Sequence, residues 1–118
     1  MVKKIMICDD DQGILEMLEM MLEDLGYSVT TESNSIQLLN RLRGEMPDLL
    51  LLDIWMPVLS GDQVLKQMKC DARLNGLPVI MYSASSEGEL IAKNSGADAY
   101  IDKPFDLDEL ADKIRSFI

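Results

Sequence analysis

The chain contains no histidine among its 118 residues, and this absence removes several kinds of functional site. Zinc sites that depend on imidazole, histidine-based catalytic triads and a phosphohistidine carried by the chain itself are all excluded. The sequence has only two cysteines, Cys8 and Cys70, and their separation matches no metal-binding or redox motif. Cys8 lies within a predicted strand, so we interpret it as a small buried hydrophobic residue.

Long hydrophobic runs are also missing. The longest aliphatic run, residues 49–52, is bounded by Asp48 and Asp53 and is far too short to cross a membrane. The N-terminal segment has only four consecutive apolar residues before Asp9, fewer than a secretion signal requires. These features predict a cytoplasmic protein that makes no contact with membranes.

Positive charge is scarce, with 11 lysines and arginines against 21 aspartates and glutamates and a net charge of -10. The basic residues are scattered, so we expect no direct binding to nucleic acid or to anionic membranes. The length suits one domain over residues 1–118, and a hydrophobic content of 47% is enough for a core. We assign the nine methionines mainly to that core.

Short apolar runs alternate with helical patterns, which is typical of a parallel sheet covered by helices on both faces. The predicted strands span residues 4–8, 28–32, 48–53, 78–82 and 99–102. The predicted helices begin near residues 12, 35, 60, 86 and 106. Ser60 with Gln63, and Ser86 with Glu89, have the spacing of capping boxes. Right-handed crossovers make this pattern a doubly wound (βα)₅ sandwich, in which ligands bind at the carboxyl ends of the strands.

Polar side chains follow four of the five predicted strands, all at the edge formed by the carboxyl ends. These residues are Asp9, Asp10, Asp11, Asp53, Ser83 and Lys103. Carboxylates gathered at one point repel one another unless a cation lies between them. Oxygen ligands without imidazole or thiolate favour a hard cation, and Mg²⁺ fits best. A lysine and a hydroxyl facing that cation are suited to holding a phosphoryl group.

With these motifs in order, the chain resembles the receiver domains of bacterial two-component response regulators over essentially its full length. The matching segments are Asp9–Asp10, Leu52–Pro57 with Gly61, Ser83–Ala84 and Tyr100–Phe105. The resemblance implies a flavodoxin-like, three-layer α/β sandwich with a five-stranded parallel sheet in the order 2-1-3-4-5. It also implies a signal-transduction phosphoprotein or phosphorelay member, which receives its phosphoryl group from a sensor histidine kinase or a histidine phosphotransfer protein.

The resemblance implies chemical roles for the residues of the site. Asp53 would be the phosphoacceptor, Lys103 would pair with the phosphoryl oxygens, and Ser83 would hydrogen-bond the phosphoryl group. The domain would catalyse its own phosphorylation. Hydrolysis of the product is also compatible with this role. The domain would not be a conventional turnover enzyme. The bond between Lys103 and Pro104 would be cis.

The resemblance also implies a magnesium site and a conformational switch. Mg²⁺ would be bound by Asp10, by Asp53 and by the backbone carbonyl of Trp55, and through a water molecule by Asp9. Tyr100 would turn inward as Ser83 moves. The surface formed by the fourth helix, fifth strand and fifth helix would then act on an output domain or partner protein, in a monomer or a weak phosphorylation-dependent dimer.

Several of these residues also have simpler interpretations. Asp9 or Asp10 could cap the first helix, and for Asp11 capping or solvation is the favoured role. Ser83 could be an ordinary loop hydroxyl, and Tyr100 could be edge packing. The paired acids that precede this tyrosine in the winged-helix transcription-factor subfamily are reduced here to a single one, which disfavours that subfamily's salt-bridged dimer.

Three other functions were weighed against the phosphoacceptor. A Mg²⁺-dependent phosphatase with an aspartate nucleophile needs a second acid two residues after Asp53, where Trp55 stands. A flavin binder needs a phosphate loop rich in small residues, where residues 9–11 are aspartates that would repel phosphate. A degenerate receiver that serves only as a protein-binding module is disfavoured by the intact acidic site.

Overall fold

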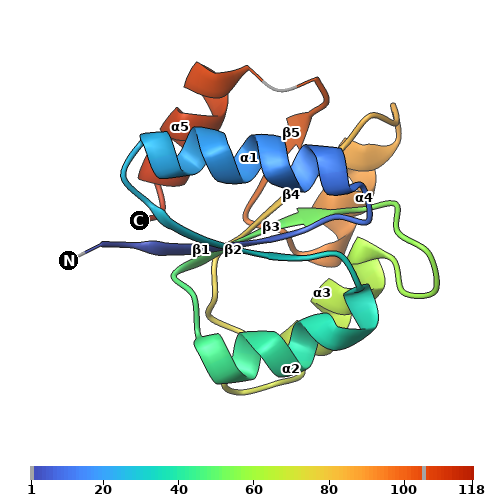
Figure 1. Cartoon of the computed structure of the whole chain (residues 1–118). Helices are drawn as coiled ribbons and strands as arrows, with labels where there is room; N and C mark the ends of the chain where they lie inside the picture. The colour runs from blue at the N-terminus through green and yellow to red at the C-terminus, as the bar shows by residue number, and fades with distance from the viewer. Residues whose placement is uncertain (1, 105) are drawn as a thin grey trace.

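The computed structural model describes residues 2–104 and 106–118, which form a sheet between two layers of helices (Figure 1). Phe105, part of the last matching segment, lies outside the described residues. The strands are β1 (Lys4–Cys8), β2 (Ser28–Glu32), β3 (Leu49–Asp53), β4 (Val79–Ser83) and β5 (Ala99–Asp102). The helices are α1 (Gln12–Asp24), α2 (Ser35–Glu45), α3 (Gly61–Lys69), α4 (Gly88–Ser95) and α5 (Leu107–Arg115).

All neighbouring strands pair in parallel, in the order β2-β1-β3-β4-β5. Helices α1 and α5 cover one face of the sheet, and α2, α3 and α4 cover the other (Figure 1). This confirms the predicted doubly wound α/β sandwich and its strand order. Because every strand is parallel, the carboxyl ends of β1, β3, β4 and β5 meet at one edge.

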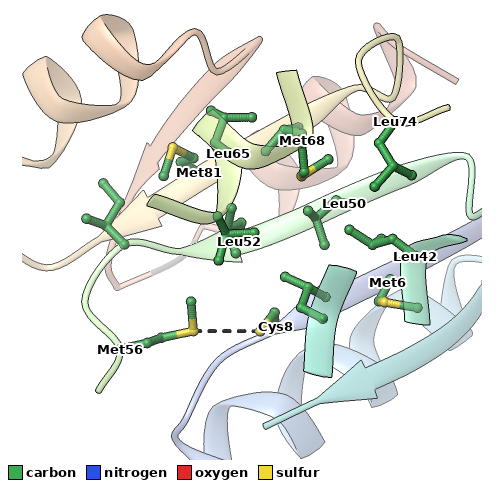
Figure 2. Packing of buried hydrophobic residues seen from close by; sticks show 14 of the residues in the cluster. Met6, Cys8, Leu42, Leu50, Leu52, Met56, Leu65, Met68, Leu74 and Met81 are labelled. Atoms are coloured by element: carbon green, nitrogen blue, oxygen red, sulfur yellow. Dashed lines mark hydrogen bonds between the residues drawn. The ribbon is translucent and has the colours of Figure 1, made fainter. Parts of the chain in front are cut away.

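The central strands β3 and β4 are buried at every position, as expected for strands with helices on both faces. Alternate residues of β3 enter two different cores. Leu50 and Leu52 pack with α2 and α3 (Figure 2), whereas Leu49 and Leu51 pack with α1 and α5. Burial on both sides fixes the strand register, and the register sets where the polar residue that ends each strand lies.

The structure corrects the predicted start of the fourth helix. The capping box at Ser60 is present, with the Gln63 side chain accepting the Ser60 N–H at 2.9 Å. The one at Ser86 was wrong, because α4 begins only at Gly88. The Ser85 hydroxyl accepts the Glu87 N–H at 3.1 Å and the Ser85 carbonyl accepts the Gly88 N–H at 3.1 Å, so a turn centred on residues 85–88 precedes the helix.

The methionines are only partly core residues. Met6, Met56, Met68 and Met81 are buried. Met17, Met20 and Met46 are exposed, because the buried face of α1 is formed by its leucines and Met46 ends α2.

Among the described residues, no helix has the length and apolarity needed to cross a bilayer.

Candidate functional site

Three of the predicted aspartates meet at the carboxyl edge of the sheet. Oxygens of Asp9, Asp10 and Asp53 lie within 4.8 Å of one another. Asp9 follows β1 and is fully buried, Asp53 ends β3 and is 4% exposed, and Asp10 is exposed to solvent. The structure therefore brings together the carboxylates that the sequence places at separate strand ends, and it leaves one of them accessible from outside. We call this cluster the acidic pocket.

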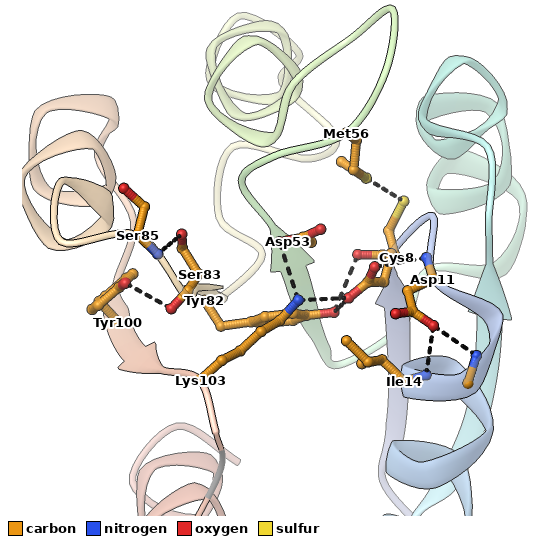
Figure 3. A network of polar contacts seen from close by, with 12 residues as sticks. Cys8, Asp11, Ile14, Asp53, Met56, Tyr82, Ser83, Ser85, Tyr100 and Lys103 are labelled. Carbon is orange, nitrogen blue, oxygen red and sulfur yellow. Dashed lines mark hydrogen bonds and ion pairs between the residues drawn. The ribbon is translucent and has the colours of Figure 1, made fainter.

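Asp9 is anchored by three protein donors. Its Oδ1 atom accepts the Asp11 N–H at 2.9 Å, and its Oδ2 atom accepts the Tyr82 hydroxyl at 2.8 Å. Lys103 Nζ lies 3.4 Å from the same Oδ2 atom (Figure 3). Asp9 does not cap α1: the Asp11 side chain does so, accepting the N–H groups of Gly13 and Ile14, as expected for that residue.

Lys103 brings positive charge to the pocket. Its Nζ atom lies 3.4 Å from Asp9 Oδ2 and 3.7 Å from Asp53 Oδ1. The peptide bond between Lys103 and Pro104 is cis, as predicted. Among the residues that the structure describes, this lysine is the one cation in ion-pair contact with the cluster, so three carboxylates share a single positive charge.

Burial, together with the crowded negative charge, changes how Asp53 ionises. Burial raises the pKa of Asp53 to about 7, the negative charge of Asp9 adds to the rise, and Lys103 opposes it. Burial also raises the pKa of Tyr82 well above its ordinary value, aided by the charge of Asp9, so the phenol stays a hydrogen-bond donor. Without further positive charge, the pocket favours a proton on Asp53.

The donor set fits a hard divalent cation. It consists of carboxylate oxygens, and the nearby thiol of Cys8 points instead at Met56, with 3.6 Å between the two sulfur atoms. Oxygen-only sites of this kind suit Mg²⁺. Trp55 lies two residues beyond Asp53, in the loop after β3, with its side chain 50% exposed. Its backbone carbonyl remains a predicted ligand.

Ser83 and Tyr100 lie together beside this pocket. Ser83 is the last residue of β4 and is fully buried, and its Oγ atom accepts the Ser85 N–H at 2.9 Å. The Tyr100 hydroxyl donates to the Ser83 carbonyl at 3.1 Å (Figure 3). Gly88 makes room for this contact, since a Cβ atom there would lie 2.3 Å from the Tyr100 hydroxyl. Tyr100 is therefore more than edge packing: it bonds to the strand end that carries Ser83.

One polar member of the site, Tyr82, was not predicted from the sequence. Its apolar neighbours in β4 made it look like an ordinary core residue. The strand register places it directly beside Asp53, and its hydroxyl reaches Asp9. A usable signal was present, because a buried phenol at a strand end requires a hydrogen-bond partner.

Comparison with known proteins gives a family. Residues 5–115 match the model of the response regulator receiver domain. The chain is 33% identical over 120 residues to the alkaline phosphatase synthesis transcriptional regulatory protein PhoP of Bacillus subtilis, covering 100% of this chain and 49% of that protein. It is 36% identical over 118 residues to the probable transcriptional regulator ycf27 of Guillardia theta, covering 98% and 45%. The chain thus spans about half the length of these relatives.

Solved structures agree. A CheY-like response regulator receiver domain protein from Methanospirillum hungatei superimposes with a TM-score of 0.87 at 34% identity, covering 98% of this chain and 93% of that one. The receiver domain of a sensor histidine kinase from Pseudomonas aeruginosa, which has a magnesium ion coordinated in its active site cleft, gives a TM-score of 0.91 at 25% identity over 99% and 98%. The chain belongs to the response regulator receiver domain family, whose members act in two-component signalling.

Proposed function

We propose that Asp53 accepts a phosphoryl group from a phosphohistidine of a partner protein, in a reaction that requires Mg²⁺. The observation that carries this proposal is the convergence of Asp9, Asp10 and Asp53 with Lys103 at the carboxyl edge of the sheet. Since the chain has no histidine, the donor is a second protein, a sensor histidine kinase or a histidine phosphotransfer protein, or a small phosphodonor.

The transfer is a substitution at phosphorus. A carboxylate oxygen of Asp53 forms a bond to phosphorus while the bond from phosphorus to the donor's imidazole nitrogen breaks, and the leaving imidazole takes the electron pair. Lys103, already 3.7 Å from Asp53 Oδ1, pairs with the phosphoryl oxygens. The Ser83 hydroxyl can donate to them, because its Oγ atom accepts the Ser85 N–H and keeps its own proton free.

The acidic pocket would hold the metal for this reaction. Asp10, Asp53 and the Trp55 carbonyl would bind Mg²⁺ directly, and Asp9 would bind it through water. When bound, Mg²⁺ neutralises negative charge on the reacting oxygens. Neutralisation keeps Asp53 ionised and able to attack, which the metal-free pocket opposes by raising the pKa of Asp53 to about 7.

The signal leaves through Ser83 and Tyr100. A bond between Ser83 and the phosphoryl group shifts the end of β4, whose carbonyl holds the Tyr100 hydroxyl at 3.1 Å. The face formed by α4, β5 and α5 then acts on an output domain or target protein. Residues 1–118 form this single domain, located in the cytoplasm, without direct contact to nucleic acid or membrane. It is a monomer or a weak phosphorylation-dependent dimer.

Mass spectrometry of the intact protein tests the proposal. Incubation with Mg²⁺ and acetyl phosphate should add one phosphoryl group that is stable in acid and labile in base. Asp53→Asn should abolish the addition. Asp98→Asn, an equivalent change at the opposite edge of the sheet, should leave it intact. Equal labelling of Asp53→Asn would refute the assignment, and failure of the wild type to label with any phosphodonor would favour a protein-binding module.

A further inference from the structure

Tyr82 borders the acidic pocket and has no role in the proposed phosphoryl transfer. The residue belongs to β4, pairs with Asp53 of β3 in the parallel register, and has a side chain that is 1% exposed. Its ring packs in the core beneath α1 and α5, while its hydroxyl points out of that core toward Asp9 (Figure 3). One side chain therefore connects the core to the pocket.

The Tyr82 hydroxyl lies 3.5 Å from the backbone carbonyl of Cys8, and the side chain also contacts two charged groups at the pocket. The hydroxyl donates a hydrogen bond of 2.8 Å to Asp9 Oδ2, a bond strengthened by the charge of its acceptor. The ring lies 5.0 Å, measured at its centroid, from the Nζ atom of Lys103, within range of a cation–π interaction. Tyr82 thus contacts both the buried acid and the lysine that neutralises it.

We propose that Tyr82 is a positioning residue of the acidic pocket, which orients Asp9 toward the water shell of the metal and supports Lys103 beneath it. The Mg²⁺ part of this inference rests on the proposed function. Asp9 Oδ1 is engaged by the Asp11 N–H and Oδ2 by Tyr82, so both oxygens already serve protein donors. This occupancy favours contact through water at Asp9 under the proposed function, whereas the exposed Asp10 is open to direct ligation.

Tyr82→Phe isolates the hydroxyl, because it keeps the ring against the core and against Lys103. Loss of a residue that hydrogen-bonds a metal-site carboxylate commonly weakens metal binding by about tenfold or more. We expect the Kd for Mg²⁺, measured by titration of Trp55 fluorescence, to rise about tenfold in Tyr82→Phe. Tyr27→Phe removes a hydroxyl just before β2, at the opposite edge of the sheet from the pocket, and should leave the Kd unchanged.

A double-mutant cycle separates positioning from a general loss of stability. If the hydroxyl acts through Asp9, Tyr82→Phe should change the Kd less than twofold in a protein that already carries Asp9→Asn. An unchanged Kd in the single variant, or a full tenfold effect in both backgrounds, would overturn the proposal.

A measurement on the wild type keeps the proposal testable if the variant does not fold. The hydroxyl proton of Tyr82 should be a slowly exchanging NMR resonance coupled to its ring, present without metal, and lost in Asp9→Ala. A rapidly exchanging hydroxyl would overturn the anchoring of Asp9. If the wild type bound no Mg²⁺ while this resonance persisted, the proposed function and the metal part of this proposal would fail, and the anchoring of Asp9 would stand.

Discussion

Aspartates occupy both edges of the sheet, and the two edges use them differently. At the amino edge, Asp48 accepts the N–H of Lys4 at 2.7 Å, and Asp98 accepts the N–H of Val79 at 2.8 Å. Each of these carboxylates satisfies the first residue of a strand. At the carboxyl edge, Asp9, Asp10 and Asp53 crowd around one lysine.

The difference shows how the same residue type becomes structural or reactive. A lone carboxylate beside a free backbone donor stabilises the fold by a charge-assisted bond. Clustered carboxylates cost stability until a cation or a proton neutralises them. The contact made by Asp98 also holds its side chain against β4.

Neutral replacements at the two edges should have opposite effects on metal-free stability. At pH 8 with a chelator present, Asp53→Asn should raise the free energy of unfolding by about 1–3 kcal/mol, because it removes one of three mutually repelling charges. Asp98→Asn should lower it by about 1 kcal/mol, because the bond to the Val79 N–H loses its charge. Urea unfolding measures both changes. If the two replacements changed the unfolding free energy in the same direction, the distinction between the edges would be lost.

The pH dependence of the metal-free protein sharpens the same comparison. The pKa of Asp53 is raised by burial to about 7 in the folded protein, against an ordinary value of 3.8. Between these values the folded state binds more protons than the unfolded state, so stability should fall as pH rises toward 7. When the pH is lowered from 8 to 6, the unfolding free energy of the wild type should rise. It should regain part of the stabilisation that Asp53→Asn shows at pH 8.

The control variants make this pH experiment specific. Asp53→Asn should lose most of the slope, while Asp98→Asn should keep it. An unfolding free energy in the chelated wild type that rises from pH 6 to pH 8 would show that Asp53 is ionised without difficulty in the folded protein.

The Trp55 side chain should lengthen the life of the phosphorylated state, given the proposed function. Its half-exposed ring lies two residues beyond the reacting carboxylate, and shielding by that ring would impede water approaching the acyl phosphate. Trp55→Asn keeps the backbone carbonyl and removes the ring, so phosphorylation should survive and hydrolysis should accelerate. Val58→Asn, a change in the same exposed loop, should leave the rate unaltered. Equal or slower hydrolysis in Trp55→Asn would refute the shielding.

The two cysteines should differ in reactivity. Burial raises the pKa of the Cys8 thiol to about 12, whereas Cys70 is exposed. A thiol reagent at pH 8 should therefore modify one cysteine quickly in the native protein and the second only on unfolding. Fast modification of both thiols in the native protein would show that the structure around Cys8, at the end of β1, opens readily.

Much of the fold was predictable because burial and topology leave clear marks on this sequence. The apolar runs in the sequence predicted the ends of all five strands to within one residue. Parallel topology alone predicted that Asp9, Asp10 and Asp53 lie at one edge of the sheet. Ser83 was predicted to follow β4 and instead ends it, because its carbonyl pairs with the Lys103 N–H and extends the ladder.

The rest depended on tertiary contacts that no local pattern records. Tyr82 looks like a core residue until the register brings its hydroxyl to Asp9. Ser86 has the spacing of a cap, yet the turn at Ser85 delays the helix to Gly88, where Tyr100 must also fit. Met17 and Met20 are exposed because the leucines of α1 already fill the face of that helix that meets the sheet.

Magnesium-linked stability tests the central claim most directly, namely that the carboxyl edge is a charge cluster built to be neutralised by a cation. The free energy of unfolding should rise with Mg²⁺, by about 2.7 kcal/mol at a hundred times the Kd. Asp98→Asn should show the same rise from a lower starting point, and Asp10→Asn should lose most of it. A wild-type stability that stays constant from chelator to saturating Mg²⁺ would contradict the account.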